Sequence, residues 1–125
     1  MRRPLFAFAA LLALGTPAFA DEVSDAKAAI AAANLSEESD LLMWCGAAFT
    51  IASAVATDDA VKKSADDMVN ALFGKAAPLL TADGVADADL ASFGTNYTVV
   101  AKYQIVDQKE AAEHTQDECT AAAKE

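Results

Sequence analysis

LLMWCGAAFTIASAVA, residues Leu41–Ala56, is a run of 16 residues without a charged side chain, and it decides the fold. It is rich in Ala, and Asp40 and Asp58 flank it without an aromatic belt. A helix that spans a bilayer needs about 20 apolar residues, so this run is too short for a membrane-inserted segment. It predicts a helix that is buried on nearly all sides.

The segments on either side of this run also predict helices, because alanine is abundant and β-branched runs are rare. Asn34 and Ser36 indicate a turn before it, with Ser36 or Ser39 as the expected N-cap of the apolar helix. Upstream, Asp21–Ala33 predicts a helix whose apolar stripe is Val23, Ala26, Ile30 and Ala33. Downstream, Thr57-Asp58-Asp59 is expected to cap a helix with the stripe Val61, Ala65, Met68, Leu72, Ala76 and Leu79.

Three further signals mark the end of that helix and the start of the next one. Pro78 is expected to kink or end the helix, and Asp83-Gly84 is expected to end the short segment after the proline. Asp87 or Asp89 is then expected to cap a helix that carries Leu90, Phe93, Tyr97, Val100 and Ala101.

The last third of the chain leaves one assignment between helix and strand. Tyr97–Val106 has a strand-like composition, but the helical stripe that leads into it favours helix. Thr115-Gln116-Asp117-Glu118 is a capping box for a short helix over Cys119–Lys124. Together these elements predict an all-α protein: a small single-domain antiparallel bundle of four to five helices.

The N-terminus has the three parts of a secretory signal peptide. Met1-Arg2-Arg3 is positive, Leu5–Leu14 is apolar, and Ala18-Phe19-Ala20 is a small-x-small cleavage site. Residues 1–20 are therefore predicted to be a cleaved signal peptide, and residues 21–125 the helical domain. Because Asp21 rather than Cys follows the cleavage site, we expect a periplasmic or secreted protein and not a lipoprotein.

Charge restricts the partners of the mature chain. Residues 21–125 contain 7 Lys, no Arg and 19 Asp and Glu, a formal net charge of −12. Such a surface repels phosphate backbones and anionic lipids, so nucleic-acid binding and electrostatic membrane docking are not expected. We also expect no membrane span after signal cleavage.

Cys45 and Cys119 are the two cysteines of the chain, and in an exported protein they predict one disulfide. The bond would tie a short terminal helix to the most buried one. Buried free thiols are one alternative, and a catalytic Cys45 with His114, in the chain order of papain-like enzymes, is another. The catalytic alternative is disfavoured because a thiol inside an apolar helix is inert.

Other candidate chemistry is weak, and we expect no enzyme activity, no cofactor and no metal. The Asp83–Asp89 stretch lacks the calcium-loop order, because Gly84 precedes its later aspartates. His114 with Glu110, Glu113 and Asp117 offers one imidazole only, so these residues are interpreted as a solvated face.

Trp44 is expected either in the core against the disulfide or on the surface as a partner-binding anchor. Trp44, Cys45, Phe49 and Cys119 together resemble the HdeA-type acid-activated chaperones, which are acidic helical periplasmic proteins. The chain departs from that pattern, because its tryptophan is directly adjacent to the cysteine and its cysteines are further apart. The resemblance implies a holdase that opens when its carboxylates are protonated.

Three functions therefore remain open from the sequence. The favoured one is a non-enzymatic exported module, an envelope accessory protein that binds an unknown protein or peptide partner. The first alternative is the acid-activated periplasmic holdase, and the second is a carrier of a small hydrophobic ligand along Leu41–Ala56.

Overall fold

The computed structural model describes residues 17–125, and the predicted features of residues 1–16 lie outside this part. Residues 17–125 form five α-helices and one 3-10 turn, with no strand among them. The elements are α2 (Pro17–Ala33), α3 (Glu37–Val55), α4 (Asp59–Ala82), η1 (Asp87–Asp89), α5 (Leu90–Ile105) and α6 (Gln116–Lys124). The all-α prediction is confirmed, and the segment that was ambiguous between helix and strand belongs to α5 up to Ile105.

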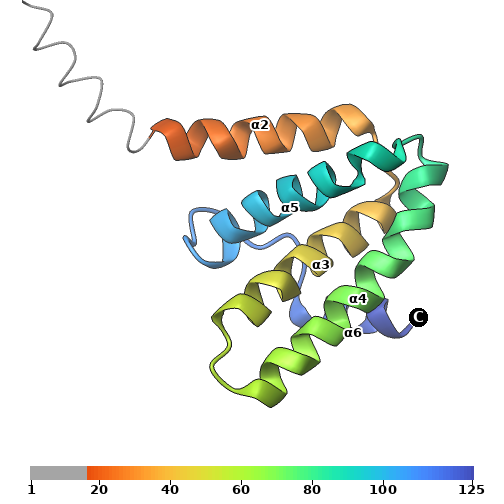
Figure 1. Ribbon diagram of the computed structural model, residues 1–125. Coiled ribbons are helices and arrows are strands. Elements are labelled where there is room, and N and C mark those ends of the chain that lie inside the picture. The colour runs from red at the N-terminus through yellow and green to blue at the C-terminus, as the bar shows by residue number, and fades with distance from the viewer. Residues whose placement is uncertain (1–16) are drawn as a thin grey trace, which may run out of the picture.

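The helices pack in a row with α6 behind it (Figure 1). α2 packs on α5, α5 on α3, and α3 on α4, while α6 contacts both α3 and α4. The α2/α5 and α3/α4 pairs are antiparallel, whereas α3 and α5 run in the same direction (Figure 1). The central α3 is the helix predicted from the uncharged run.

Local capping explains where most helices begin. The side chain of Ser36 accepts from the backbone N–H of Ser39 at the start of α3, and Asp58 caps α4 in the same way. The capping box of Thr115 and Glu118 is complete at the start of α6. These three predicted caps are confirmed.

The structure corrects two expectations about helix boundaries. Pro78 does not end α4, which continues to Ala82, because Ala76 and Leu80 on either side of the proline are buried in the core. Asp89 is the N-cap residue of α5, as expected, but its side chain forms no capping hydrogen bond, and the chain enters α5 through the 3-10 turn η1, which begins at Asp87. Asp83-Gly84 does end α4, with Gly84 at a φ of 101°.

The core is centred on the first half of α3. Every residue from Leu42 to Ala47 is buried, whereas the second half of the helix is largely half-buried and Val55 is 68% exposed. The expectation of burial on nearly all sides is therefore wrong for the second half of α3. Val61, which was predicted on the α4 stripe, is 56% exposed.

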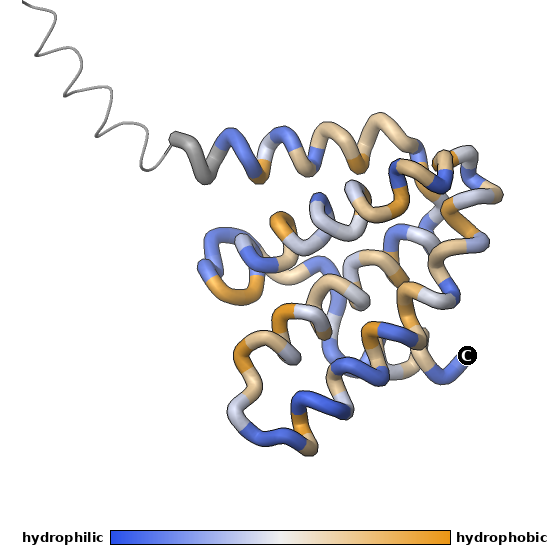
Figure 2. Tube along the Cα trace, viewed as in Figure 1, coloured by the Kyte–Doolittle hydropathy of each residue, from blue (hydrophilic) through white to orange (hydrophobic). Residues whose placement is uncertain are grey.

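Apolar and hydrophilic residues alternate along the helices (Figure 2), and buried residues of α3, α4, α5 and α6 form one core cluster. α4 approaches closely at Gly46, where an added Cβ would clash with the ring of Phe73. Within residues 17–125, no helix combines the length and the apolar character that crossing a membrane requires.

Candidate functional site

The two cysteine sulfurs lie 2.07 Å apart, which is a disulfide distance, and their Cα atoms are 5.3 Å apart. The pair joins α3 to α6, and both residues are buried. No free cysteine remains among the described residues, and the chain has no other cysteine. A thiol nucleophile is therefore absent from this arrangement.

Trp44 is a core residue rather than a surface anchor, with only 2% of it exposed. Its indole Nε1–H donates to Oε1 of Gln104 on α5, at 2.8 Å. Its ring stands edge-on to the His114 ring, with centroids 5.5 Å apart and an interplanar angle of 68°. The tryptophan thus connects α3, α5 and the loop between α5 and α6.

The buried Gln104 extends this contact into a polar network that reaches the surface of the molecule. It is 6% exposed, and its amide nitrogen donates to Glu110 at 2.8 Å and to Glu113 at 3.3 Å. Glu110 also accepts from Lys27 on α2, at 2.7 Å. The hydrogen bonds from Gln104 and Lys27 lower the pKa of Glu110. The loop is therefore fastened to α5 and to α2.

His114 is not on a solvated face, which corrects the sequence interpretation. Its side chain is 22% exposed, because the loop lays the ring against Trp44. Its Nε2 atom is buried and has no hydrogen-bond partner among the described residues, while Nδ1 lies 4.0 Å from a carboxylate oxygen of Glu118. A buried polar atom without a partner is costly, so it points to a missing interaction.

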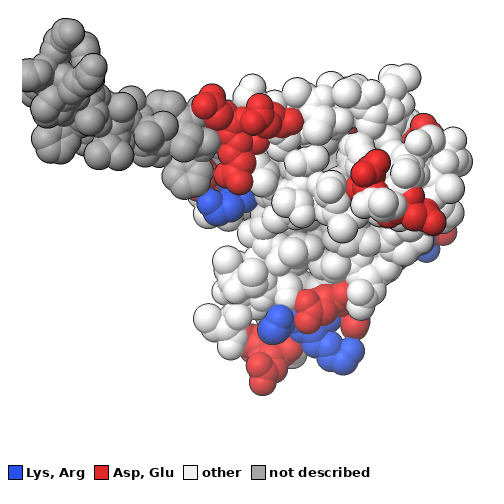
Figure 3. Space-filling model, turned by 45° about the horizontal axis from the view of Figure 1, so that its top comes forward, with Lys and Arg blue, Asp and Glu red and all other residues white. Residues whose placement is uncertain are grey.

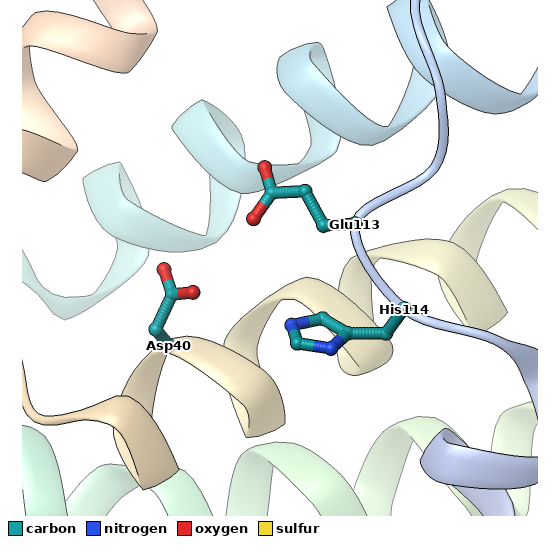
Figure 4. Close-up of side chains that lie close together, drawn as sticks. All are labelled: Asp40, Glu113 and His114. Carbon is teal, nitrogen blue, oxygen red and sulfur yellow. The ribbon is translucent and has the colours of Figure 1, made fainter.

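Two carboxylates lie beside this imidazole (Figure 4). Asp40 comes from the first turn of α3, and Glu113 comes from the loop, next to His114. The ligand-type atoms of the three residues all lie within 4.8 Å of one another. The sequence groups His114 with Glu110, Glu113 and Asp117, and the structure brings only Glu113 of these into the cluster. The sequence does not predict Asp40 as its third member.

Tyr97 also contacts Asp40. Its hydroxyl donates to Oδ1 of Asp40 at 2.5 Å. Burial, and then the hydrogen bond to Asp40, raise the pKa of Tyr97 far above its ordinary value, so the phenol remains a donor. The other carboxylate oxygen of Asp40 is left for a different partner.

A second polar junction joins the start of α3 to the end of α4. Oδ2 of Asp83 accepts from the hydroxyl of the fully buried Ser39 at 2.7 Å and from the backbone N–H of Ser36 at 3.1 Å. The Ser39 hydroxyl, followed by the Ser36 backbone, lowers the pKa of Asp83. The sequence marks Asp83 only as the end of a helix.

A hollow runs along α5, between α5 and α4 at one end and toward the start of α2 at the other. Two adjoining cavities of about 430 and 320 Å³ share Phe73, Ala91 and Gly94. We call them together the α4–α5 groove. Its floor includes Met43, and one end reaches Glu22 on α2 and Asp107 after α5. The groove is mainly apolar, and small side chains of α5 line one of its walls.

Charged side chains surround a broad uncharged area on one face of the molecule (Figure 3). Acidic groups gather where α2 begins, and a mixed cluster lies at the start of α4. In that cluster Lys62 pairs with Asp66 and Lys63 with Asp67. Exposed ion pairs of this kind contribute little to the stability of the fold, so we interpret them as ordinary surface contacts.

Comparison with known proteins gives no further guidance. No family model, no curated protein and no solved structure matches the chain. The groove, the polar network and the charge of this chain are therefore the features that bear on its function.

Proposed function

We propose that the protein is an exported, non-enzymatic module that binds a helical segment of a protein or peptide partner in the α4–α5 groove. The observation that carries the proposal is the groove itself, an apolar hollow that passes between two helices and remains open along one side of α3. Grooves between helices are a common docking place for amphipathic helices, whose apolar face covers the floor.

The shape of the groove supports a helix as the occupant. Ala91, Gly94 and Thr98 follow one another at spacings of three and four residues on α5, so they share one face. Small side chains on that face allow a second backbone to approach closely. An apolar stripe on the partner would then contact Phe73 and Met43 on the floor.

The charge of the chain supports a cationic partner. Glu22, Asp107 and Lys102 line the end of the groove, with the Lys102 ammonium 4.0 Å from Asp107, and residues 21–125 carry a formal net charge of −12. Electrostatic complementarity of this kind speeds association and selects partners of opposite charge. We therefore propose a partner segment with apolar residues at helical spacing and with Lys or Arg on its flanks.

The absence of catalysis is part of the proposal. The two cysteines are paired, and the single histidine of the chain lies against Trp44 with the carboxylates of Asp40 and Glu113 beside it. Export is proposed from the signal-like N-terminus, and a disulfide between α3 and α6 suits an oxidising compartment.

The test is a selection from a random library of displayed 20-residue peptides against the disulfide-bonded protein. Gly94→Leu fills the groove, and Gly74→Leu is the matched control, because both glycines are helical and a Cβ at either meets no atom within 4 Å. We expect enriched peptides that are cationic and amphipathic and that bind Gly94→Leu at least about tenfold more weakly, or 1.4 kcal/mol. Equal binding to both variants, or no enrichment, would refute the proposal.

Acid-activated holdase activity is the second candidate, and the Asp83 junction favours it. A carboxyl group whose pKa is lowered in the folded state stabilises that state above its unfolded pKa, and this stabilisation is lost as the pH falls through the folded value. Protonation of Asp83 would weaken the hydrogen bonds that join α3 to α4. The net charge of residues 21–125 would swing from −12 to roughly +8 over the same range.

The holdase is tested by the aggregation of an acid-denatured client enzyme at pH 2–3 with and without the protein. If the protein suppresses client aggregation at pH 2–3 but not at pH 7, the result supports holdase activity. Unchanged client aggregation at every pH eliminates it, and the peptide selection then decides the first proposal by itself.

A further inference from the structure

The loop between α5 and α6 brings the single histidine of the chain to two carboxylates from different parts of the sequence. Glu113 is its neighbour in the chain, whereas Asp40 lies on α3, more than 70 residues earlier. Figure 4 shows the imidazole pointing toward the space between the two carboxylate groups. We propose that Asp40, Glu113 and His114 bind one divalent transition-metal ion, with Zn²⁺ as the best match.

The unpartnered imidazole nitrogen is the first support. Nε2 of His114 is buried without a hydrogen-bond partner among the described residues, although a neutral imidazole needs one donor and one acceptor contact. A metal ion satisfies such a nitrogen directly. His114 is held in this position by its edge-on contact with Trp44, so its ring does not have to be ordered when the ion binds.

Both carboxylate ligands also have an outer contact of the kind that orients metal-binding side chains. Tyr97 donates to Oδ1 of Asp40, and Gln104 donates to Oε2 of Glu113. A carboxylate oxygen of Glu118 lies 4.0 Å from Nδ1 of His114, which is too far for a hydrogen bond, so the ring is positioned by Trp44 instead. The two carboxylates are therefore held in place, and one oxygen of each remains for the ion.

The distances between the three ligand atoms fit a site in which these atoms move closer together when the ion binds. The three ligand atoms lie within 4.8 Å of one another, whereas a tetrahedral zinc ion holds its ligand atoms roughly 3.4 Å apart. Glu113 is exposed on a loop, so its side chain can close this difference by rotation. An imidazole with two carboxylates favours zinc and its transition-metal neighbours over calcium or magnesium, which prefer oxygen ligands alone. The proposal is independent of the α4–α5 groove.

The experiment is calorimetric titration of untagged, chelator-treated protein with Zn²⁺ at neutral pH, in the presence of excess Mg²⁺. We expect one ion per chain with a dissociation constant of about 10 µM or tighter. Co²⁺ should quench the emission of Trp44, the only tryptophan, with the same stoichiometry. Zn²⁺ at tenfold excess over the dissociation constant should raise Tm by about 5 °C.

Glu113→Gln and Asp40→Asn should each weaken binding at least about tenfold, and His114→Ala should abolish it. Asp87→Asn removes the same charge from an exposed position outside the cluster and should bind as the wild type does. Glu113→Gln decides the question if His114→Ala does not fold, because Glu113 is exposed. The proposal is overturned if binding is absent, if several weak sites appear, or if Glu113→Gln and Asp87→Asn bind equally.

Discussion

Removal of the Cys45–Cys119 bond should expose how much of the fold depends on the last helix. The bond closes a loop of 75 residues, counted with both cysteines, and the chain-entropy relation for that length gives about 4.5 kcal/mol at 25 °C. α6 has only 9 residues and is too short to be stable by itself. Domains of this size are stable by about 5–15 kcal/mol, so the bond supplies a large share.

The assay is urea unfolding of the oxidised protein and of the Cys45→Ala/Cys119→Ala variant, with amide hydrogen exchange on both. We expect a loss of about 3–4.5 kcal/mol in the free energy of unfolding, since both side chains are buried. Amides of α6 should lose protection before those of α3. A loss below about 1 kcal/mol, with α6 still protected, would refute the reasoning that the bond holds α6 on the core.

Three further changes test separate parts of the structure. Gln104→Leu should cost about 1–3 kcal/mol in urea unfolding, because it leaves the buried Trp44 Nε1–H without its acceptor; an unchanged midpoint would contradict that contact. Asp83→Asn should lower stability at pH 7 but match the wild type near pH 2, because the stabilisation from its lowered pKa is lost as the pH falls; a constant difference across pH would be the opposite result. Gly94→Leu and Gly74→Leu should each raise the free energy of unfolding by about 0.5–1 kcal/mol, because leucine favours helix and a Cβ at either position meets no atom within 4 Å. A thermal melt in which either variant is less stable than the wild type would contradict the free space at that glycine.

The parts of the fold that the sequence predicts are those with local causes. Ser36, Asp58 and the Thr115–Glu118 box each bond to backbone atoms within three residues, so their spacing alone indicates a helix start. Pro78 shows the limit of local reasoning. The packing of Ala76 and Leu80 against the core outweighs the hydrogen bond that proline removes.

The candidate site depends on contacts between distant residues, which no spacing rule contains. Asp40 and Tyr97 are separated by 57 positions, and Trp44 and Gln104 by 60. His114 has polar neighbours in the sequence, which suggest a solvated face. The partial burial of His114 follows from the contact of its ring with Trp44 on α3, 70 positions earlier in the chain. The one signal in the sequence was that His114 is the only histidine of an otherwise acidic segment.

Chemical-shift mapping of a selected peptide on the protein tests the proposed groove most directly. Amide signals of the protein would be recorded during titration with the tightest-binding library peptide. If the peptide binds in the α4–α5 groove, the largest chemical-shift changes fall on groove residues, including Phe73, Ala91 and Gly94, with little change around Trp44. Changes confined to the acidic start of α2, or to the charged cluster at the start of α4, would contradict binding in the groove.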